Sequence, residues 1–194
     1  SETLKVKKLN HIAEIYKNYD TYIIDLWGVI HNGITLNSRA IEVVKNLTQN
    51  RKKVIFLSNA PRPSKEVKFF LLGLNMDDRY LHNIMTSGEA AMLALQKESY
   101  GKFFFHLGPK RDSGVFLNIK ENKTSLEKCN FILCTGLFDE HQGDLDYYKK
   151  LLQDYSPDKE EIGKFIYMHY INKSKEKHLI DRINVSSESL KNIL

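Results

Sequence analysis

One carboxylate and one hydroxyl stand at equivalent places in two apolar segments of the chain. Asp25 ends the run "YIID" before a turn containing Gly28, and Ser58 ends "VIFLS" before Asn59. An aspartate at the carboxyl end of a buried parallel strand can attack a phosphorus atom and can also bind Mg²⁺. A hydroxyl and the exposed amides of turns can hydrogen-bond phosphoryl oxygens. These residue types predict a phosphate site, and an acid that only caps a turn is the alternative.

The same two segments supply the other candidate site residues. Because Mg²⁺ prefers oxygen ligands, we expect the Asp25 carboxylate and the backbone carbonyl of Trp27 to bind it. The segment "SNAPRP" brings Arg62 near the expected phosphate. The side chain of Trp27 has two interpretations that the sequence leaves open, a packing residue that covers the strand end or a residue that shapes the pocket. The candidate set is catalytic Asp25 and Ser58, with Trp27, Gly28, Asn59 and Arg62 as substrate-binding or phosphate-binding residues.

The segments that carry these residues read as strands of a parallel sheet. "TYIIDLW" is short, rich in β-branched and aromatic residues and without polar alternation, as in a strand covered on both faces. "KKVIFLSNAP" repeats the pattern of a strand followed by a turn, and Pro61 and Pro63 end the strand. Strands that alternate with helices predict an open parallel α/β sheet, which binds its ligands at the carboxyl ends of its strands. If these two strands are neighbours, Asp25 and Ser58 meet at one edge.

Helices are predicted between and after these strands. One begins at Ser38 as its cap, and a second runs from Ser64 to Gly73. Apolar spacing predicts a lead-in helix within 4–19. Further along, we expect a helix in "NIMTSGEAAMLALQKE" capped by Thr86 or Ser87, strands in "KFFFHLG" and "CNFILCTG", and a helix in "DLDYYKKLLQDY". From about 156 the fold is uncertain, apart from a strand-like patch at 165–171.

Composition narrows the function classes. The chain has 194 residues, of which 42% are hydrophobic and 27% charged, as in ordinary globular proteins. A net charge of +5 is spread over scattered lysines, and without a recognisable module it indicates a solvated basic surface and no nucleic-acid partner. The two cysteines and the histidines lack zinc spacing. The sequence has neither a long apolar run nor a signal peptide, so we expect a cytoplasmic protein without membrane contact.

Several motifs resemble one family in the correct order. "YIIDLWGVIHNG" and "KKVIFLSNAPR" resemble motifs I and II of the haloacid dehalogenase-like (HAD) phosphohydrolases, in the class IIA subgroup of NagD and the 4-nitrophenylphosphatases. "IMTSGEAAMLAL", "FFFHLGPKRD" and "FILCTGLFDE" resemble the opening helix and first strands of that subgroup's inserted cap. The resemblance covers about 20–152. It implies a Rossmann-like core with an α/β cap and Mg²⁺-dependent hydrolysis of small phosphorylated metabolites, with the cap selecting the substrate.

The resemblance also implies residue roles. Asp25 matches the nucleophile and metal ligand, and Ser58 matches the phosphate-binding hydroxyl of motif II. Gly28 and Asn59 match positions that shape the phosphate loop, and Gly33 matches the glycine of the following turn. "GPKRD" places Lys110 and Arg111 on a cap loop, where they either contact a substrate anion or form a solvated basic turn.

Two departures set limits on the resemblance. Motif I normally reads Asp-x-Asp, and Trp27 replaces the second aspartate. Indole cannot perform general acid–base catalysis, which typically contributes about 10²–10⁴-fold. This D-x-W-G motif is either a subgroup trait or a loss. The lysine of motif III and the acidic pair of motif IV have no convincing match in 153–194, and "GDLDYY" resembles the acidic motif only superficially.

The chain is therefore interpreted as a C-terminally truncated member of the class. We expect a partial HAD-like core at 1–82, a partial cap at 83–155 and a divergent tail at 156–194. The leading hypothesis is a phosphohydrolase that acts through an aspartyl-phosphate and is impaired by the missing motifs. The alternative is a non-catalytic remnant or interaction module that retains a phosphate-binding half-site. Besides a phosphorylated metabolite, the partners considered are a second copy of the chain and a complementing C-terminal fragment.

Overall fold

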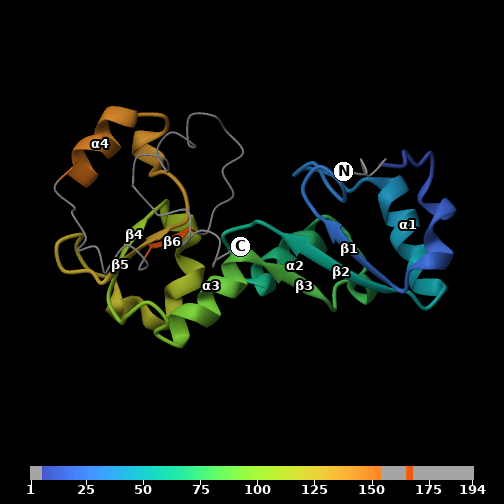
Figure 1. Cartoon of the computed structure of the whole chain (residues 1–194), viewed down its shortest axis with the longest axis horizontal. Coiled ribbons are helices and arrows are strands. Elements are labelled where there is room, and N and C mark those ends of the chain that lie inside the picture. The colour runs from blue at the N-terminus through green and yellow to red at the C-terminus, as the bar shows by residue number, and fades with distance from the viewer. Residues whose placement is uncertain (1–5, 154–164, 168–194) are drawn as a thin grey trace, which may run out of the picture. The chain divides into compact units, whose positions relative to one another are not determined.

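The computed structural model describes residues 6–153 and 165–167 (Figure 1). These residues fold as α/β, as predicted, in two compact units. The first unit holds 6–58 and 68–85, and the second holds 59–67 and the described residues from 86 onward. In the described part of the chain, no helix is long and apolar enough to cross a membrane.

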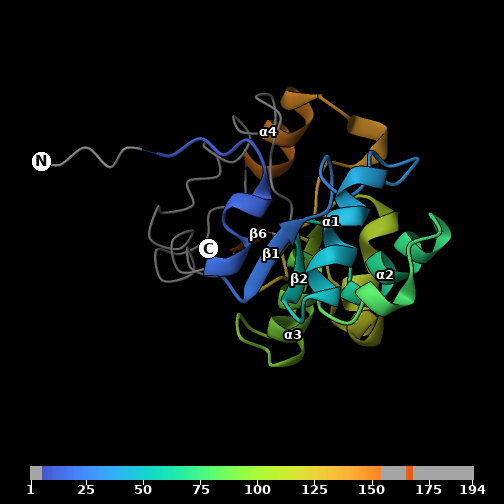
Figure 2. The same ribbon diagram turned by 90° about the vertical axis from the view of Figure 1, so that its right-hand side faces the viewer.

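The first unit contains a three-stranded sheet. Its strands are β1 (Thr21–Asp25), β2 (Lys53–Ser58) and β3 (Ile84–Thr86), in the order β1-β2-β3. β1 and β2 are parallel and pair Tyr22 with Val54 and Asp25 with Leu57. Figure 2 shows the two strands side by side with α1, which packs against β2. The predicted parallel pairing of these two segments is confirmed.

The helices of the first segments agree with the predictions in part. α2 (Ser64–Gly73) begins and ends where expected. α1 (Ser38–Gln49) is capped by Asn37, so the prediction of Ser38 as cap is wrong. Asn37 has an extended backbone, and its side-chain oxygen accepts hydrogen bonds from the amides of Arg39 (3.2 Å) and Ala40 (3.3 Å). Ser38 already lies inside the first turn.

The predicted lead-in helix is also wrong over its described residues. Two short 3₁₀ helices, Ile12–Glu14 and Tyr16–Asn18, occupy that segment. His11 caps the first of them by accepting a hydrogen bond from the amide of Ala13 (3.0 Å). Helical backbone is interrupted at Ile15, where φ is −120°, so the two turns do not merge into one α-helix.

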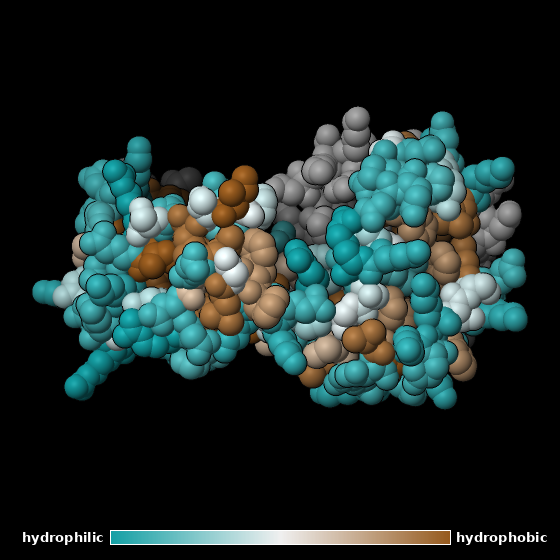
Figure 3. All heavy atoms as spheres, turned by 180° about the vertical axis from the view of Figure 1, so that it is seen from behind, coloured by the Kyte–Doolittle hydropathy of each residue, from teal (hydrophilic) through white to brown (hydrophobic). Residues whose placement is uncertain are grey.

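The two faces of the β1–β2 pair differ in exposure. The register places Tyr22 and Phe56 on one face, where both are buried, and Ile23 and Leu57 on the other. Ile23 is 67% exposed and Leu57 50%. The expectation that β1 is covered on both faces is therefore wrong among the described residues, and β2 likewise has a half-exposed side chain at Leu57. Apolar side chains accordingly reach the surface of the first unit (Figure 3).

The second unit contains another parallel sheet. β4 (Phe104–Leu107), β5 (Phe131–Cys134) and β6 (Phe165–Tyr167) lie in the order β4-β5-β6. The first two correspond to predicted strands, and β6 lies in the predicted patch. α3 (Ser87–Gln96) and α4 (Leu145–Gln153) are the predicted helices, and 3₁₀ turns form Lys110–Asn122. The remainder of the tail expected at 156–194 lies outside the described residues.

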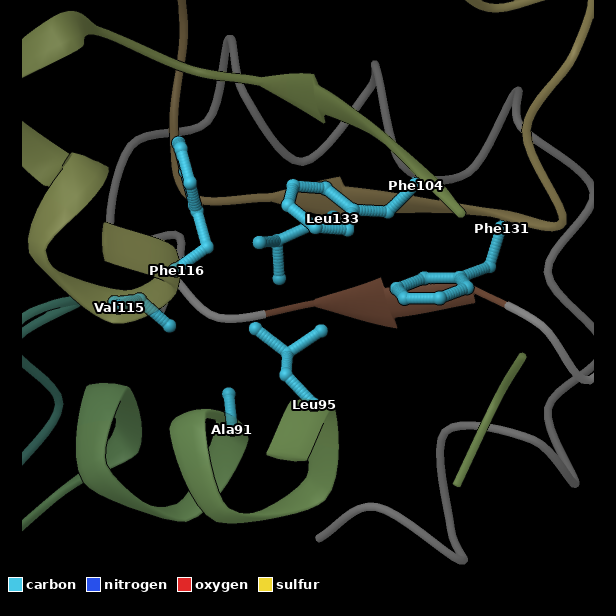
Figure 4. Close-up of a cluster of buried hydrophobic side chains, with 7 residues drawn as sticks. All are labelled: Ala91, Leu95, Phe104, Val115, Phe116, Phe131 and Leu133. Atoms are coloured by element: carbon cyan, nitrogen blue, oxygen red, sulfur yellow. The ribbon is translucent and has the colours of Figure 1, made fainter. Parts of the chain in front are cut away.

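The core of the second unit lies on both faces of β5, whose four residues are all buried. On one face, α3 and the 3₁₀ segment direct apolar side chains at the sheet (Figure 4). Leu107, Ile132 and Tyr148 pack on the other face. The first cluster consists of Ala91, Leu95, Phe104, Val115, Phe116, Phe131 and Leu133. β5 is thus covered on both faces.

Candidate active site

Asp25 and Ser58 lie at the same edge of the first sheet. Because β1 and β2 are parallel and Asp25 pairs with Leu57, Ser58 is the next residue at the carboxyl end of β2. The expectation that the two residues share an edge is confirmed. Asp25 is exposed, and its Oδ1 accepts a hydrogen bond from the amide of Leu26 (2.8 Å). Ser58 is 9% exposed. The structure thus places an accessible carboxylate and a nearly buried hydroxyl at the carboxyl ends of two paired strands.

The loop after β1 is fixed by its own backbone. The amides of Val29, Ile30 and His31 all donate to the Leu26 carbonyl, at 3.2, 2.8 and 3.2 Å. The amide of Gly28 donates to the His31 carbonyl at 2.8 Å, which closes the turn. Gly28 has φ +77°, a left-handed conformation in which a side chain would be strained. The tight turn predicted at Gly28 therefore has a physical cause.

This loop also presents a candidate metal ligand. Three amides converge on the Leu26 carbonyl, and within the described ranges no backbone amide donates to the carbonyl of Trp27. That oxygen and the Asp25 carboxylate form a set of two oxygen donors at one strand end. Mg²⁺ commonly takes one or two protein oxygens and completes its shell with water and substrate phosphate. The two donors are therefore of the type that Mg²⁺ accepts, while the described residues include no group of three or more His, Cys, Asp or Glu side chains that could hold a metal ion.

His31 packs within this loop, although the sequence pattern indicated no role for it at the site. Its side chain is 7% exposed, and Nδ1 accepts a hydrogen bond from the amide of Gly33 (2.9 Å). Its ring contacts Trp27 and Phe70 at centroid distances of 5.4 and 5.2 Å. Burial lowers the pKa of His31, and the negative charge of Asp25 opposes this shift. The only sequence signal was its place between Gly28 and Gly33 in the turn after the aspartate.

The Asn59–Arg62 loop belongs to the second unit, where α3 fixes it. The hydroxyl of Thr86 donates to the Arg62 carbonyl (2.6 Å), and the amide of Gly88 donates to the Ala60 carbonyl (3.0 Å). The structure places Asp25 and Ser58 in one unit and Asn59 and Arg62 in the other. The side chains of Asn59 and Arg62 are exposed. Their roles toward phosphate remain predictions.

A second polar group lies at the carboxyl ends of β4 and β5. Lys110 and Arg111 are both exposed, and Arg111 forms an ion pair with Asp139. The buried ring of His106 is hydrogen-bonded through Nε2 to the Thr135 hydroxyl (2.8 Å). Burial, with a smaller contribution from the charge of Lys123, lowers the pKa of His106 from 6.5 to about 4.

The lowered pKa of His106 leads us to expect that the stability of the fold depends on pH. Between about pH 6.5 and 4 the unfolded chain takes up a proton that folded His106 does not, so the free energy of unfolding falls as the pH falls. The shift corresponds to about 3 kcal/mol. His106→Gln keeps a hydrogen-bonding group for Thr135 but does not titrate, so urea unfolding at about pH 7 and 4.5 should show a smaller loss for the variant. Equal losses in the two proteins would contradict the prediction.

A comparison with known families identifies the chain. Residues 22–119, just over half of it, match the sequence model of the haloacid dehalogenase-like hydrolases. The chain belongs to this family. The matched segment contains β2 and all of β1 except Thr21, so the HAD family assignment includes Asp25 and Ser58. None of the curated protein sequences matches the chain significantly.

Solved structures of HAD proteins share the fold. A haloacid dehalogenase-like hydrolase from Brucella suis is 25% identical, with a TM-score of 0.65 over 75% of this chain and 55% of its own. A 4-nitrophenylphosphatase from Thermotoga maritima is 17% identical, with a TM-score of 0.55 over 90% and 67%. A glycerol phosphate phosphatase from Mycobacterium tuberculosis, solved with magnesium, is 19% identical, with a TM-score of 0.51 over 73% and 43%. The chain thus spans about half the length of the Brucella protein.

Proposed function

We propose that this HAD chain is a phosphohydrolase of the class IIA lineage that hydrolyses a small phosphorylated metabolite. The observation that carries the proposal is the placement of Asp25 beside the end of β2, where Ser58 follows, within the segment matched to the family. The names of the Thermotoga and Mycobacterium neighbours, both phosphatases, support the same reaction class. We also propose the domain division suggested by the sequence, with a partial core at 1–82 and a partial cap at 83–155.

The proposed reaction has two displacements at phosphorus. In the first, a carboxylate oxygen of Asp25 forms a bond to phosphorus while the bond to the ester oxygen breaks, and the leaving group departs with that electron pair and takes a proton from water. In the second, water attacks the phosphorus of the aspartyl-phosphate and the Asp25–phosphorus bond breaks. Inorganic phosphate leaves, and the Asp25 carboxylate is restored.

Neighbouring groups assist by holding the phosphoryl oxygens. The proposed hydrogen-bond donors are the Ser58 hydroxyl and the amides of the turns after β1 and β2. They stabilise the negative charge that develops on the phosphoryl oxygens. Gly28 permits close approach of the backbone because it has no side chain. Asn59 and Arg62 keep the phosphate-binding roles that the sequence suggested, as a proposal.

Magnesium is the proposed cofactor. The Asp25 carboxylate and the Trp27 carbonyl would hold it, and when bound it neutralises negative charge on the phosphate and orients it. The Mycobacterium neighbour was solved with magnesium, which supports the choice of metal. Activity lower than that of class members that carry motifs III and IV is part of the proposal, because 153–194 contains no convincing match to either motif.

Turnover of an aryl phosphate tests this function. The purified chain should release 4-nitrophenol from 4-nitrophenyl phosphate in the presence of Mg²⁺, and excess chelator should abolish the release. Inorganic phosphate should inhibit it competitively, since it binds the same donors. Binding of inorganic phosphate without turnover of 4-nitrophenyl phosphate would favour the alternative, a non-catalytic phosphate-binding module. Absence of both turnover and phosphate binding would contradict both functions.

A further inference from the structure

The side chain of Trp27 is exposed yet held in place. It is 64% exposed to solvent, although it lies two residues after Asp25 in the loop at the end of β1. Its ring meets the His31 ring edge to face, with an interplanar angle of 89°. A Cβ atom added to Gly33 would lie 2.7 Å from Cη2 and from Cζ3 of the indole. The six-membered half of the indole therefore rests against the Gly33 backbone, where no side chain could fit.

The support beneath the indole is itself fixed. His31 is buried, its Nδ1 accepts the amide hydrogen of Gly33, and its ring packs against Phe70 of α2 with an interplanar angle of 65°. Trp27, His31 and Phe70 thus form a row of rings that ties the loop to α2 within the first unit. An immobilised side chain loses little further conformational entropy when a ligand binds to it, a loss that otherwise costs about 0.5–1.5 kcal/mol per side chain.

The exposed part of this ring system suits a flat ligand group. Aromatic pairs gain about 0.5–1.5 kcal/mol beyond the burial of their surface. Two more apolar side chains of the same loop are exposed, Val29 (42%) and Ile34 (79%). This loop follows Asp25 directly, so it is the nearest apolar surface in the sequence for the leaving group of a phosphate ester bound at Asp25. Apolar, planar surface is the chemistry that the loop offers to that group.

We propose that Trp27 is the binding surface for the leaving group, and that the substrates of this chain are phosphate esters with a planar aromatic group next to the phosphate. This inference rests on the proposed function, because it takes Asp25 as the phosphate end of the site. The indole supplies no proton to the departing oxygen, since it does not titrate near neutral pH. Aromatic alcohols are acidic enough to leave with little such help.

Fluorescence provides a direct test, because Trp27 is the only tryptophan of the chain. Phenylphosphonate and cyclohexylphosphonate carry the same charge and similar bulk, but only the first is planar, and neither is hydrolysed. In the presence of Mg²⁺, phenylphosphonate should change the Trp27 emission saturably and bind about 3- to 10-fold more tightly than cyclohexylphosphonate, which corresponds to about 0.6–1.4 kcal/mol. Inorganic phosphate should displace both compounds.

The outcomes separate this inference from the proposed function. Equal affinity of the two phosphonates, with both displaced by inorganic phosphate, would overturn the role of Trp27 and leave the phosphate site standing. Binding of neither compound nor phosphate would overturn the site itself. Phenylphosphonate binding that phosphate does not displace would separate Trp27 from the phosphate site and overturn the inference as stated.

Two variants test the ring directly, with affinities measured by calorimetry. Trp27→Phe keeps an aromatic face, whereas Trp27→Leu keeps an apolar side chain without one. The preference for phenylphosphonate over cyclohexylphosphonate should persist in the first variant and fall to about unity in the second. Because Trp27 is mostly exposed, both variants should retain the fold. A preference that survives in Trp27→Leu would overturn the proposal.

Discussion

Asp25→Asn is expected to reduce the Mg²⁺-dependent turnover of 4-nitrophenyl phosphate by roughly 10³-fold or more, as removal of a covalent nucleophile does in other enzymes. An amide oxygen is a poor nucleophile, and the variant also removes a negative charge from the proposed metal site. The fold should be retained, because Asp25 is exposed and the Asn oxygen can still accept the hydrogen bond from the Leu26 amide. Initial rates of 4-nitrophenol release measure the effect.

Asp20→Asn is the matched control for this variant. Asp20 immediately precedes β1 and Asp25 ends it, so the two aspartates lie at opposite ends of one strand. The Asp20 side chain is 99% exposed and forms an ion pair with Lys52 at 3.4 Å, a contact worth little at a surface. Turnover in Asp20→Asn should equal that of the unmodified chain. Unchanged turnover in Asp25→Asn would exclude Asp25 as the nucleophile.

Gly88→Ala should be among the most destabilising single substitutions in the second unit. A Cβ atom at this position would lie 2.3 Å from the backbone N, C and O atoms of Arg62. Alanine favours a helix over glycine by about 1 kcal/mol, but overpacking costs about 1–3 kcal/mol, and more when backbone must move. We therefore expect a net loss of about 2 kcal/mol or more, measured by urea unfolding followed by circular dichroism.

Gly73→Ala serves as the control for this substitution. Gly73 is the last residue of α2, and a Cβ atom there would meet no atom within 4 Å. The change should be neutral or stabilise the chain by about 0.4–1 kcal/mol, since alanine restricts the unfolded chain. Equal urea midpoints for Gly73→Ala and Gly88→Ala would contradict the close approach of α3 to the Arg62 loop.

The parts of the fold that the sequence predicted were those with local signals. α2 was found because Ser64 follows Pro63 and the apolar pattern stops at Gly73. The α1 cap was missed because Asn37 and Ser38 are both good caps, and only the backbone conformation decides between them. The exposed face that carries Ile23 and Leu57 could not be foreseen either, because coverage of a strand depends on distant segments.

In the candidate site, too, some features could be predicted from the sequence and others depend on packing between distant segments. Asp25 and Ser58 were brought together correctly because strand order and direction alone place the carboxyl ends of adjacent parallel strands at one edge. His31 was missed because its importance arises from packing against Phe70, on a helix much later in the chain. The close contact of Gly88 with the Arg62 backbone is likewise a property of packing. Local sequence predicted only that Thr86 or Ser87 caps the helix, and the structure has Thr86 as the cap.

The convergence of three amides on the Leu26 carbonyl has a consequence for hydrogen exchange. The amides of Val29, Ile30 and His31 lie outside helices and strands, yet each donates a hydrogen bond in the free protein. The amide of Asn37 also donates to the Ile30 carbonyl, at 2.7 Å. They should therefore exchange slowly with deuterium, as strand amides do. Since the loop is already ordered, adding phosphate should change these exchange rates little, and the anion would meet a preformed turn.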